Sequence, residues 1–447
     1  MTEIDPEELE ACLAVLARVE QLPVEHPQAV AVRRATAKLF KTAKEIRRAE
    51  RRAAVAANDR AVMAATATAA PGRIDDETRG IELTTAAGAT AGTLLRARPC
   101  YQCKHKYTEV DGFYHQLCPE CAALNRERRE ARADLTGRRA LLTGGRAKIG
   151  MYIALRLLRD GAHTTITTRF PKDAARRFAS MPDSHEWIDR LKIVGIDLRQ
   201  PGQVMALADA VAAEGPLDII INNAAQTVRR SPDAYALLVA GESAALPAAP
   251  DVLELGDAHD LHPVTTLALT ARSTAVDAGG LVPDDVDHNS WTQRVGEVDP
   301  VEMLEVQLCN TTAPFILIDR LRASLAASPA RRTYIVNVSA MEGSFGRGYK
   351  GPGHPHTNMA KAALNMLTRT SARELWESDG ILMTSVDTGW ITDERPQTTK
   401  LRLADEGFHA PLDLVDGASR VYDPIVRGEA GEDLYGVFLK DYAPTQW

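Results

Sequence analysis

Short apolar runs alternate with helical patterns throughout the chain after residue 138. Runs of this length that are bounded by Gly or Asp are typical of buried strands. They cover residues 140–143, 164–167, 193–196, 219–221, 334–338 and 382–386. Because strands separated by helices indicate βαβ units, we expect an α/β domain with a doubly wound parallel sheet.

Two helices are expected near the N-terminus. Asp5 is placed to cap the first helix, with Pro6 at its first position and leucines following on one face. The second runs from about residue 27 to 58, and ten basic residues lie between Arg33 and Arg60. A basic helix can bind nucleic acid or an acidic partner, but a solvated charged face is the simpler interpretation.

Changes in composition and in the hydrophobic pattern divide the chain into four parts. A helical segment is expected over residues 1–63. Residues 64–95 are rich in Ala, Thr and Gly and are expected to form a linker. A small cysteine module follows over residues 96–134, and the α/β domain takes residues 135–447. Within that domain, residues 226–296 resemble an insertion and have few signals for helix or strand except at 235–239 and 264–271.

Composition narrows the class of protein. The 447 residues carry a formal net charge of −7 and are 45% hydrophobic, as in a folded globular chain. No stretch has the roughly 18 consecutive apolar residues of a membrane helix. The acidic N-terminus is unlike a secretory signal, so a cytoplasmic location without membrane attachment is expected. The negative charge also disfavours nucleic acid as a partner of the whole chain.

Four of the six cysteines form two Cys-x2-Cys pairs separated by fourteen residues. The pairs are Cys100 with Cys103, and Cys118 with Cys121. Two such pairs can close a tetrahedral site, so the spacing predicts a structural zinc ion held by four thiolates. A four-thiolate site has no open coordination position, and its expected role is to fold a small module. Four thiols without metal are the weaker alternative.

A glycine-bearing turn follows the first strand of the α/β domain and leads into a helix. It reads Thr143-Gly144-Gly145-Arg146-Ala147-Lys148-Ile149-Gly150. A turn of this kind offers free N–H groups and a helix N-terminus to a pyrophosphate. Further landmarks follow in order: Asp197-Leu198, Asn222-Asn223-Ala224-Ala225, Asn310, Asn337-Val338-Ser339-Ala340 and Lys361-Ala362-Ala363. Over residues 135–447 the chain resembles the short-chain dehydrogenase/reductase family.

This resemblance implies a Rossmann domain that binds NAD(P). In it Asp197 approaches the adenine, and Asn223 and Ala224 line the cofactor. Lys361 holds the nicotinamide ribose, and Thr392 faces the carboxamide. The full set of cofactor-binding residues implied is Thr143, Gly144, Arg146, Lys148, Ile149, Gly150, Arg169, Asp197, Leu198, Asn223, Ala224, Lys361 and Thr392.

Two basic residues favour NADP(H) over NAD(H). Lys148 replaces the usual middle glycine of the turn, and Arg169 follows the second strand, where no carboxylate is available for a ribose 2′-hydroxyl. Cations at these positions can pair with a 2′-phosphate. NAD(H) stays open as the alternative cofactor, and solvated surface charge is the alternative role of the two cations.

The catalytic residues depart from the family pattern. Lys361 and Asn310 match it, but Thr357 stands where the family has its Tyr, and Ala340 where it has its Ser. A threonine hydroxyl is far less acidic than a phenol, so Thr357 cannot directly replace the Tyr as proton donor.

The loop from residue 343 to 356 carries candidates for the missing proton donor. It contains five glycines and is about four residues longer than the family norm. Tyr349, His354 and His356 could each reach the site from this loop, and Ser339 could help to orient the substrate. The predicted catalytic set is therefore Lys361, Asn310, Tyr349, Ser339 and His356.

Two functions are compatible with these observations. The first is an NADP(H)-dependent oxidoreductase that transfers a hydride between nicotinamide and a carbonyl or alcohol carbon of a small-molecule substrate. The second is a non-catalytic NAD(P)-binding scaffold or sensor that binds a protein or nucleic acid through its zinc module and basic helix. The insertion is expected beside the substrate pocket, a protein partner is expected at the N-terminal region, and a homo-oligomer is open.

Overall fold

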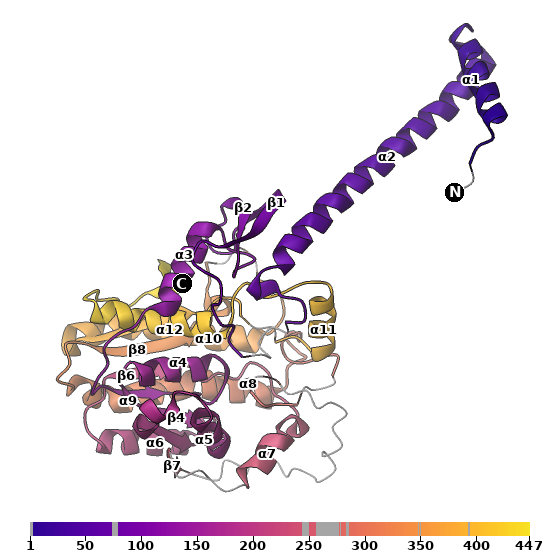
Figure 1. Ribbon diagram of the computed structural model, residues 1–447. Coiled ribbons are helices and arrows are strands. Elements are labelled where there is room, and N and C mark those ends of the chain that lie inside the picture. The colour runs from indigo at the N-terminus through magenta and orange to yellow at the C-terminus, as the bar shows by residue number, and fades with distance from the viewer. Residues whose placement is uncertain are drawn as a thin grey trace. The chain divides into compact units, whose positions relative to one another are not determined.

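The computed structural model describes residues 3–73, 79–243, 250–255, 277, 279–282, 286–346, 348, 350–391 and 394–447 (Figure 1). The chain forms two compact units. One comprises residues 1–62 and 93–97, and the other comprises residues 63–92 and 98–447.

The first unit is built on two helices, α1 (Pro6–Glu20) and α2 (Pro27–Ala64). Both begin at the prolines expected from the sequence. The Asp5 carboxylate accepts a hydrogen bond from the Glu7 N–H at 2.8 Å, so it caps α1. On α2, apolar Leu39 and Phe40 are exposed among the basic residues.

The second unit contains a nine-stranded sheet in the order β11-β10-β9-β8-β6-β3-β4-β5-β7 among the described residues. All neighbouring strands are parallel except β10 and β11. The strands are β3 (Arg139–Leu142), β4 (His163–Thr168), β5 (Leu191–Gly195), β6 (Ile219–Asn222), β7 (Asp251–Glu254), β8 (Thr333–Ser339), β9 (Ile381–Asp387), β10 (Phe438–Lys440) and β11 (Ala443–Thr445). This confirms the doubly wound Rossmann fold expected from the apolar runs. The strand order reverses between β3 and β6, where such folds bind ligands.

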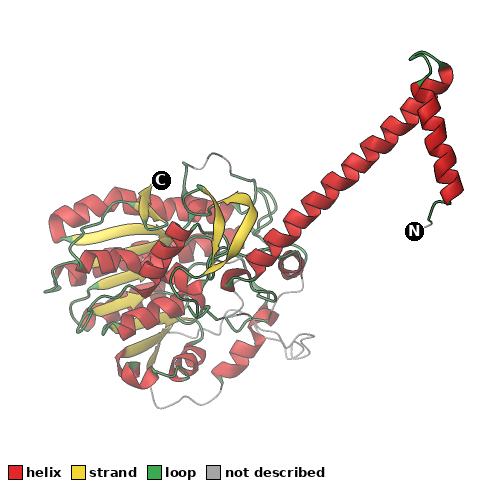
Figure 2. Ribbon diagram, turned by 45° about the horizontal axis from the view of Figure 1, so that its top comes forward, coloured by secondary structure: helices red, strands yellow, loops and turns green. Residues whose placement is uncertain are grey.

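Helices cover both faces of this sheet (Figure 2). Side chains alternate along β3: Leu141 joins the core beneath α6 and α9, whereas Ala140 and Leu142 join the core beneath α4 and α12. The helices are α4 (Lys148–Arg159), α5 (Pro171–Ala179), α6 (Pro201–Ala213), α7 (Ala236–Glu242), α8 (Pro300–Gln307), α9 (Ala313–Ala326), α10 (Pro355–Asp379), α11 (Gln397–Asp405) and α12 (Leu414–Glu429). Short 3-10 turns lie at Ser184–Glu186, Ile188–Arg190, Pro232–Tyr235 and Met341–Gly343, and a π-helical turn at Leu308–Thr312.

The four paired cysteines lie in the same compact unit as the sheet, whereas residues 93–97 of the cysteine segment belong to the first unit. The elements of this segment are β1 (Thr90–Pro99), β2 (Lys106–Asp111) and α3 (Pro119–Glu130). Arg129 of α3 forms buried ion pairs with Asp413 at 2.6 Å and with Asp416 at 3.1 Å, both at the start of α12. The structure differs from the expected linker over residues 64–95, because Arg73 is buried against the Leu412 carbonyl at 2.8 Å and β1 begins at Thr90.

The insertion contains more regular structure than the sequence suggested. Helix α7 matches one expected signal, and β7 is an additional edge strand that pairs with β5. Residues 264–271, the other expected signal, lie outside the described residues. Among the helices of the described ranges, none is long and apolar enough to cross a membrane.

Candidate active site

The turn after β3 leaves no room for side chains at two of its glycines. Gly144 has a φ of +72°, and a Cβ there would lie 2.9 Å from Ala224 Cα. A Cβ on Gly150 would lie 2.0 Å from the Gly144 carbonyl oxygen. The Asn223 amide fixes this approach by donating to the Thr143 and Gly144 carbonyls, each at 3.1 Å. The two glycines therefore let the turn pack closely at the N-terminus of α4, where a turn of this kind can bind a phosphate.

A cavity of about 420 Å³ opens beside this turn. Thr143 lies behind it, where its hydroxyl accepts the Asn223 and Ala224 N–H groups at 3.0 Å. Thr392 lies outside the described residues. The expected cofactor residues that line the cavity are Gly144, Arg146, Lys148, Ile149, Gly150, Arg169, Asp197, Leu198, Asn223 and Ala224.

The cations around this cavity differ in their partners. Arg146 pairs with Asp173 at 2.5 Å, and Lys148 lies 3.4 Å from Asp277. The Arg169 guanidinium stacks over the Tyr235 ring, with its carbon 4.8 Å from the ring centroid, and donates to that hydroxyl at 3.1 Å. Among the described residues no carboxylate lies within ion-pair distance of Arg169. It is therefore the cation most available to an added anion.

Asp197 is held as a carboxylate at the same cavity. It is 3% exposed, and its side chain accepts a 2.7 Å hydrogen bond from Arg199. Burial raises the pKa of Asp197, but the hydrogen bonds and charge of Arg199 outweigh burial, so the pKa lies below its usual value. Arg199 also pairs with Glu305 at 3.0 Å, which ties the end of β5 to α8.

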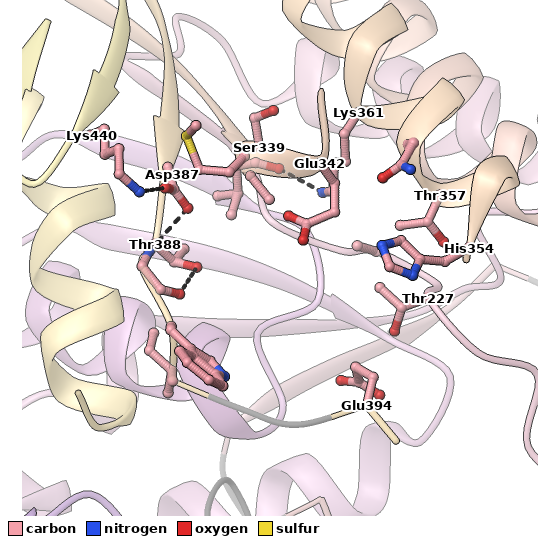
Figure 3. Close-up of a pocket in the computed structure, with 18 of the residues that line it drawn as sticks. Thr227, Ser339, Glu342, His354, Thr357, Lys361, Asp387, Thr388, Glu394 and Lys440 are labelled. Atoms are coloured by element: carbon pink, nitrogen blue, oxygen red, sulfur yellow. Dashed lines mark hydrogen bonds and ion pairs between the residues drawn. The ribbon is translucent and has the colours of Figure 1, made fainter. Parts of the chain in front are cut away.

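A second cavity of about 760 Å³ adjoins the first (Figure 3). Ile149, Asn223, Ala225, Thr227 and Glu394 line both. Figure 3 shows Asp387 and Lys440 on one side of this second cavity and His354 and Thr357 on the other. One cleft therefore joins the glycine turn to a polar chamber at the carboxyl ends of the strands.

Lys361 of α10 lies in the wall of this chamber and is buried. Its ammonium donates to the Val338 carbonyl at 2.8 Å. Burial lowers the pKa of Lys361 to about 8, although the neighbouring Cys309 and Glu342 oppose the change. Lys361 is therefore mostly protonated at pH 7 and can release its proton within the physiological range.

Two hydroxyl groups in this wall are left without partners. Ser339 is 3% exposed and Thr357 is 2% exposed, and neither hydroxyl has a hydrogen-bond partner among the described residues. Buried hydroxyls are rarely left unpaired, and a polar ligand in the chamber would satisfy them. Ala340, at the family's Ser position, also lines the chamber but offers no hydroxyl.

Asn310 is placed by the π-helical turn at Leu308–Thr312, a distortion that is frequent at functional sites. Its side-chain oxygen accepts the Gln226 N–H at 2.7 Å, and its amide donates to the Gln226 carbonyl at 2.9 Å. The side chain therefore anchors the chain that follows β6 rather than facing the chamber with a free polar group.

The glycine-rich loop before α10 places its two histidines differently. His354 lines the chamber, stacks on Trp291 with ring centroids 4.0 Å apart, and has its Nδ1 3.0 Å from the Trp291 carbonyl. His356 is buried, is not among the residues that line the chamber, and has a pKa lowered by burial. Tyr349 lies outside the described residues.

Sequence reasoning missed several groups in the chamber. Glu342, Trp291, Lys350 and Tyr101 all line it. Glu342 follows the expected Ser position by two residues, but no family motif marks it. Trp291 comes from the end of the insertion and Tyr101 from the loop between the first two cysteines, so only the fold shows that they belong here.

The four cysteines gather at one point. Their sulfur atoms all lie within 4.8 Å of one another, and Cys103 and Cys118 Sγ are 3.6 Å apart. Zinc–sulfur bonds of about 2.3 Å in a tetrahedron give sulfur–sulfur distances of roughly 3.8 Å, so the site fits a zinc ion. His115 is not part of the cluster, and its Nδ1 lies 2.7 Å from the Thr68 hydroxyl.

Sequence comparisons agree with the class of protein that this fold and cleft define. Residues 138–236 match the family model described as short chain dehydrogenase. A short-chain type dehydrogenase/reductase of Picea abies is 36% identical over 104 residues, which cover 22% of this chain and 38% of that protein. A probable oxidoreductase of Streptomyces antibioticus is 36% identical over 91 residues, covering 20% and 30% respectively. Residues 138–236 therefore match the short-chain dehydrogenase/reductase family.

One relative matches over a much longer stretch. Uncharacterized protein R665 of Acanthamoeba polyphaga mimivirus is 32% identical over 345 residues, which cover 73% of this chain and 71% of that protein. The matched stretch is longer than residues 135–447. The similarity to this relative therefore extends into the sequence that precedes the Rossmann domain.

Solved structures with a similar fold include enzymes with bound nucleotide. The Pseudomonas aeruginosa RhlG/NADP active-site complex has a TM-score of 0.44 and 20% identity, covering 68% of this chain and 95% of that one. NADPH-bound carbonyl reductase from chicken fatty liver has a TM-score of 0.45 and 20% identity, covering 70% and 100%.

Proposed function

We propose that this chain is an NADP(H)-dependent oxidoreductase that acts on a carbonyl or alcohol group of a small-molecule substrate. The observation that carries the proposal is the joined cleft. One end has the glycine turn at the N-terminus of α4, and the other has the buried Lys361 beside two unpartnered hydroxyls. When bound, the nicotinamide supplies or accepts the hydride.

The residues around the smaller cavity fit the phosphorylated form of the cofactor. Gly144 and Gly150 let the turn pack closely at the N-terminus of α4, where the pyrophosphate would bind, and Asn223 would hold the turn in place. Arg169 would pair with the 2′-phosphate, because its guanidinium faces no carboxylate among the described residues. Lys148 and Arg146 would add positive potential although each already has a carboxylate partner.

Lys361 and His354 are the groups proposed to carry the proton. Lys361 is mostly protonated at pH 7, and its ammonium would hold the ribose or pass a proton toward the substrate oxygen. His354 lines the same chamber, and its Nδ1 contact with Trp291 leaves Nε2 for the substrate side. Ser339 and Thr357 would donate hydrogen bonds that orient the substrate oxygen. Tyr349 and His356 stay as alternative proton donors, and Asn310 has a positioning role.

The cysteine cluster is proposed to hold a structural zinc ion. The four thiols provide a closed coordination shell, and no position would be left for a substrate. A protein partner at the first unit stays a prediction, supported by exposed Leu39 and Phe40 beside the basic residues of α2. Self-association and a cytoplasmic location also stay predictions.

The alternative is a scaffold that binds NAD(P) without catalysis. The replacement of the family's Ser and Tyr by Ala340 and Thr357 favours it, since both residues that act directly on the substrate oxygen are changed. A scaffold would keep the nucleotide half of the cleft and lose the chemistry of the other half.

Cofactor titration followed by turnover assays distinguishes the two functions. We expect purified protein to enhance NADPH fluorescence with a lower dissociation constant than for NADH, and to oxidise NADPH with some member of a panel of aldehydes and ketones. His354→Asn should then lower turnover about 100-fold with little change in NADPH affinity. Binding without any turnover would support the scaffold, and absence of NADPH and NADH binding would contradict both.

A further inference from the structure

The loop between the first two cysteines forms part of the active-site chamber. Tyr101 and Lys104 line the 760 Å³ cavity together with Asp387, Trp390 and Lys361. The first two belong to the cysteine segment, whereas the other three belong to the Rossmann domain. A small metal-binding motif therefore supplies a wall of the cavity in which the substrate would bind.

Specific hydrogen bonds connect this loop to the chamber. The Tyr101 hydroxyl accepts the Trp390 N–H at 2.8 Å, and the Gln102 amide donates to the Asp441 carbonyl at 3.2 Å. Asn125 of α3 donates to the Gln102 side chain at 2.8 Å. The loop thus holds both the segment after β9, at residues 388–391, and the segment after β10.

Within the described ranges, the segment after β9 is held by few backbone hydrogen bonds, besides the packing of the Trp390 ring on Phe408, with centroids 5.2 Å apart. Gly389 has a φ of +80° and no side chain, and its N–H donates to the Asp387 carboxylate at 3.1 Å. The next N–H along the chain, that of Trp390, depends on the Tyr101 hydroxyl. Residues 388–391 line the chamber beside Lys361, so their position affects what binds there.

The conformation of the loop depends in turn on the cysteines. The Cys118 N–H lies 3.4 Å from Cys100 Sγ, and the Cys100 N–H donates to the His105 carbonyl at 2.8 Å. Lys104 is held at a φ of +65°, a conformation that is uncommon for a residue with a side chain. A metal ion shared by the four sulfurs would fix this tight turn, because metal binding supplies folding energy to such motifs.

We propose that the loop from Cys100 to Lys104 is a positioning element of the active site, through which metal occupancy controls the segment at residues 388–391. Tyr101 is the positioning residue, because its hydroxyl makes the contact with Trp390. The consequence for cofactor and substrate binding rests on the proposed oxidoreductase function. The consequence for the order of the 388–391 segment does not.

Tyr101→Phe and Tyr107→Phe form a matched pair for testing this. Each removes one phenolic hydroxyl from the cysteine segment, but the Tyr107 hydroxyl donates to the His115 carbonyl at 2.9 Å within that segment. Hydrogen exchange of the full-length protein would be followed at residues 388–391, with NADPH affinity measured by fluorescence titration. The same two measurements would be made on wild-type protein after a chelator has removed the metal under reducing conditions, and again after zinc is added back.

We expect the Trp390 amide to exchange about 3- to 10-fold faster in Tyr101→Phe than in Tyr107→Phe, as for loss of one hydrogen bond. The protection of β6 and β8 amides from hydrogen exchange should be the same in both variants. NADPH affinity should fall about 3- to 10-fold in Tyr101→Phe, and fall further without metal and recover with zinc.

Equal exchange at residues 388–391 in the two variants would overturn the proposal. So would unchanged exchange of this segment in metal-stripped protein that has lost its bound metal. If the wild-type protein binds neither NADPH nor NADH, the proposed function fails, and the exchange results alone still decide whether the loop positions the segment.

Discussion

The two halves of the cleft differ in how their polar groups are satisfied. In the nucleotide half, the Asn223 amide, the Thr143 hydroxyl and the Asp197 carboxylate all have close partners within the protein. In the substrate half, the hydroxyls of Ser339 and Thr357 have none among the described residues. The first half is a preformed cradle, whereas the second keeps polar groups available for a ligand.

This contrast separates binding from chemistry. Groups with close partners lose hydrogen bonds when they move, so the proposed role of the nucleotide half is to fix the position and identity of the cofactor. Unpaired hydroxyls and a lysine with a lowered pKa are typical of sites where a proton moves. Substitutions in the nucleotide half should therefore lower cofactor affinity, whereas substitutions in the substrate half should lower turnover.

The largest effect is expected for Lys361→Met. Turnover should fall about 10²- to 10⁴-fold because the proposed proton carrier is lost, whereas NADPH binding changes less. The unfolding free energy at pH 7 should be unchanged or higher, since a buried charge is removed.

The pH dependence of stability provides a second measurement on the same variant. The pKa of Lys361 is about 8 in the folded protein and about 10.4 when unfolded. The unfolded chain therefore binds more protons between these values, and the lysine's contribution to stability rises with pH across this window. Urea unfolding at pH 7 and 9.5 should show this rise in wild type and in Lys38→Met, on the exposed face of α2, but less of it in Lys361→Met. An identical pH response in all three would contradict the lowered pKa.

Gly150→Ala should weaken cofactor binding by distorting the turn in the nucleotide half. The added Cβ would lie 2.0 Å from the Gly144 carbonyl and 2.8 Å from Asn223 Nδ2, so the turn must shift. We expect NADPH affinity to fall roughly 100-fold, as for severe overpacking. Gly202→Ala is the control, because no atom lies within 4 Å of a Cβ at that position. Wild-type affinity in Gly150→Ala would show that the turn does not bind the cofactor.

Arg169→Ala should change cofactor preference rather than binding in general. NADPH affinity should fall about 10-fold through loss of one charge-assisted contact with the 2′-phosphate, while NADH affinity changes less than about 2-fold. Arg159→Ala, which removes an exposed pair with Asp183 on the far end of α4, should leave both unchanged. An equal loss of affinity for NADPH and NADH would mean that Arg169 stabilises the fold and does not bind the 2′-phosphate.

The smallest expected effect is a pH dependence of carbonyl reduction. If the proton of Lys361 is required, kcat/KM for reduction should fall about threefold between pH 7.5 and 8.5, because the protonated fraction falls around a pKa of about 8. Oxidation of the alcohol should show the opposite trend. A flat profile for reduction from pH 7 to 9.5 would assign the proton to another group, with His354 tested next.

The sheet and the nucleotide half were predictable because local sequence specifies them. Buried parallel strands are apolar runs, and the glycines at 144 and 150 occupy positions where a Cβ collides with backbone. Strand β7 was missed because Asp251–Glu254 is short, lies at the sheet edge and carries charge at both ends. The family position filled by Lys148 has a φ of +53°, which explains why glycine is usual there.

The substrate half was less predictable because its residues meet only through long-range contacts. His354 lies in the chamber by stacking on Trp291, a residue of the insertion far from any motif. His356 had the same local sequence signal, yet it is buried outside the chamber lining. Periodicity and spacing describe neighbours along the chain, so they could not distinguish these two histidines.

The hydrogen bond between Tyr101 and Trp390 joins residues 289 positions apart. Closing so long a loop costs conformational entropy, so we expect this contact to form late in folding, once the intervening chain is ordered. During synthesis the hydrogen bond between Tyr101 and Trp390 can therefore form only after strand β9 and the segment that follows it have been made. A ribosome-bound chain that ends before residue 390 should have the four paired cysteines and a glycine turn, yet no completed chamber.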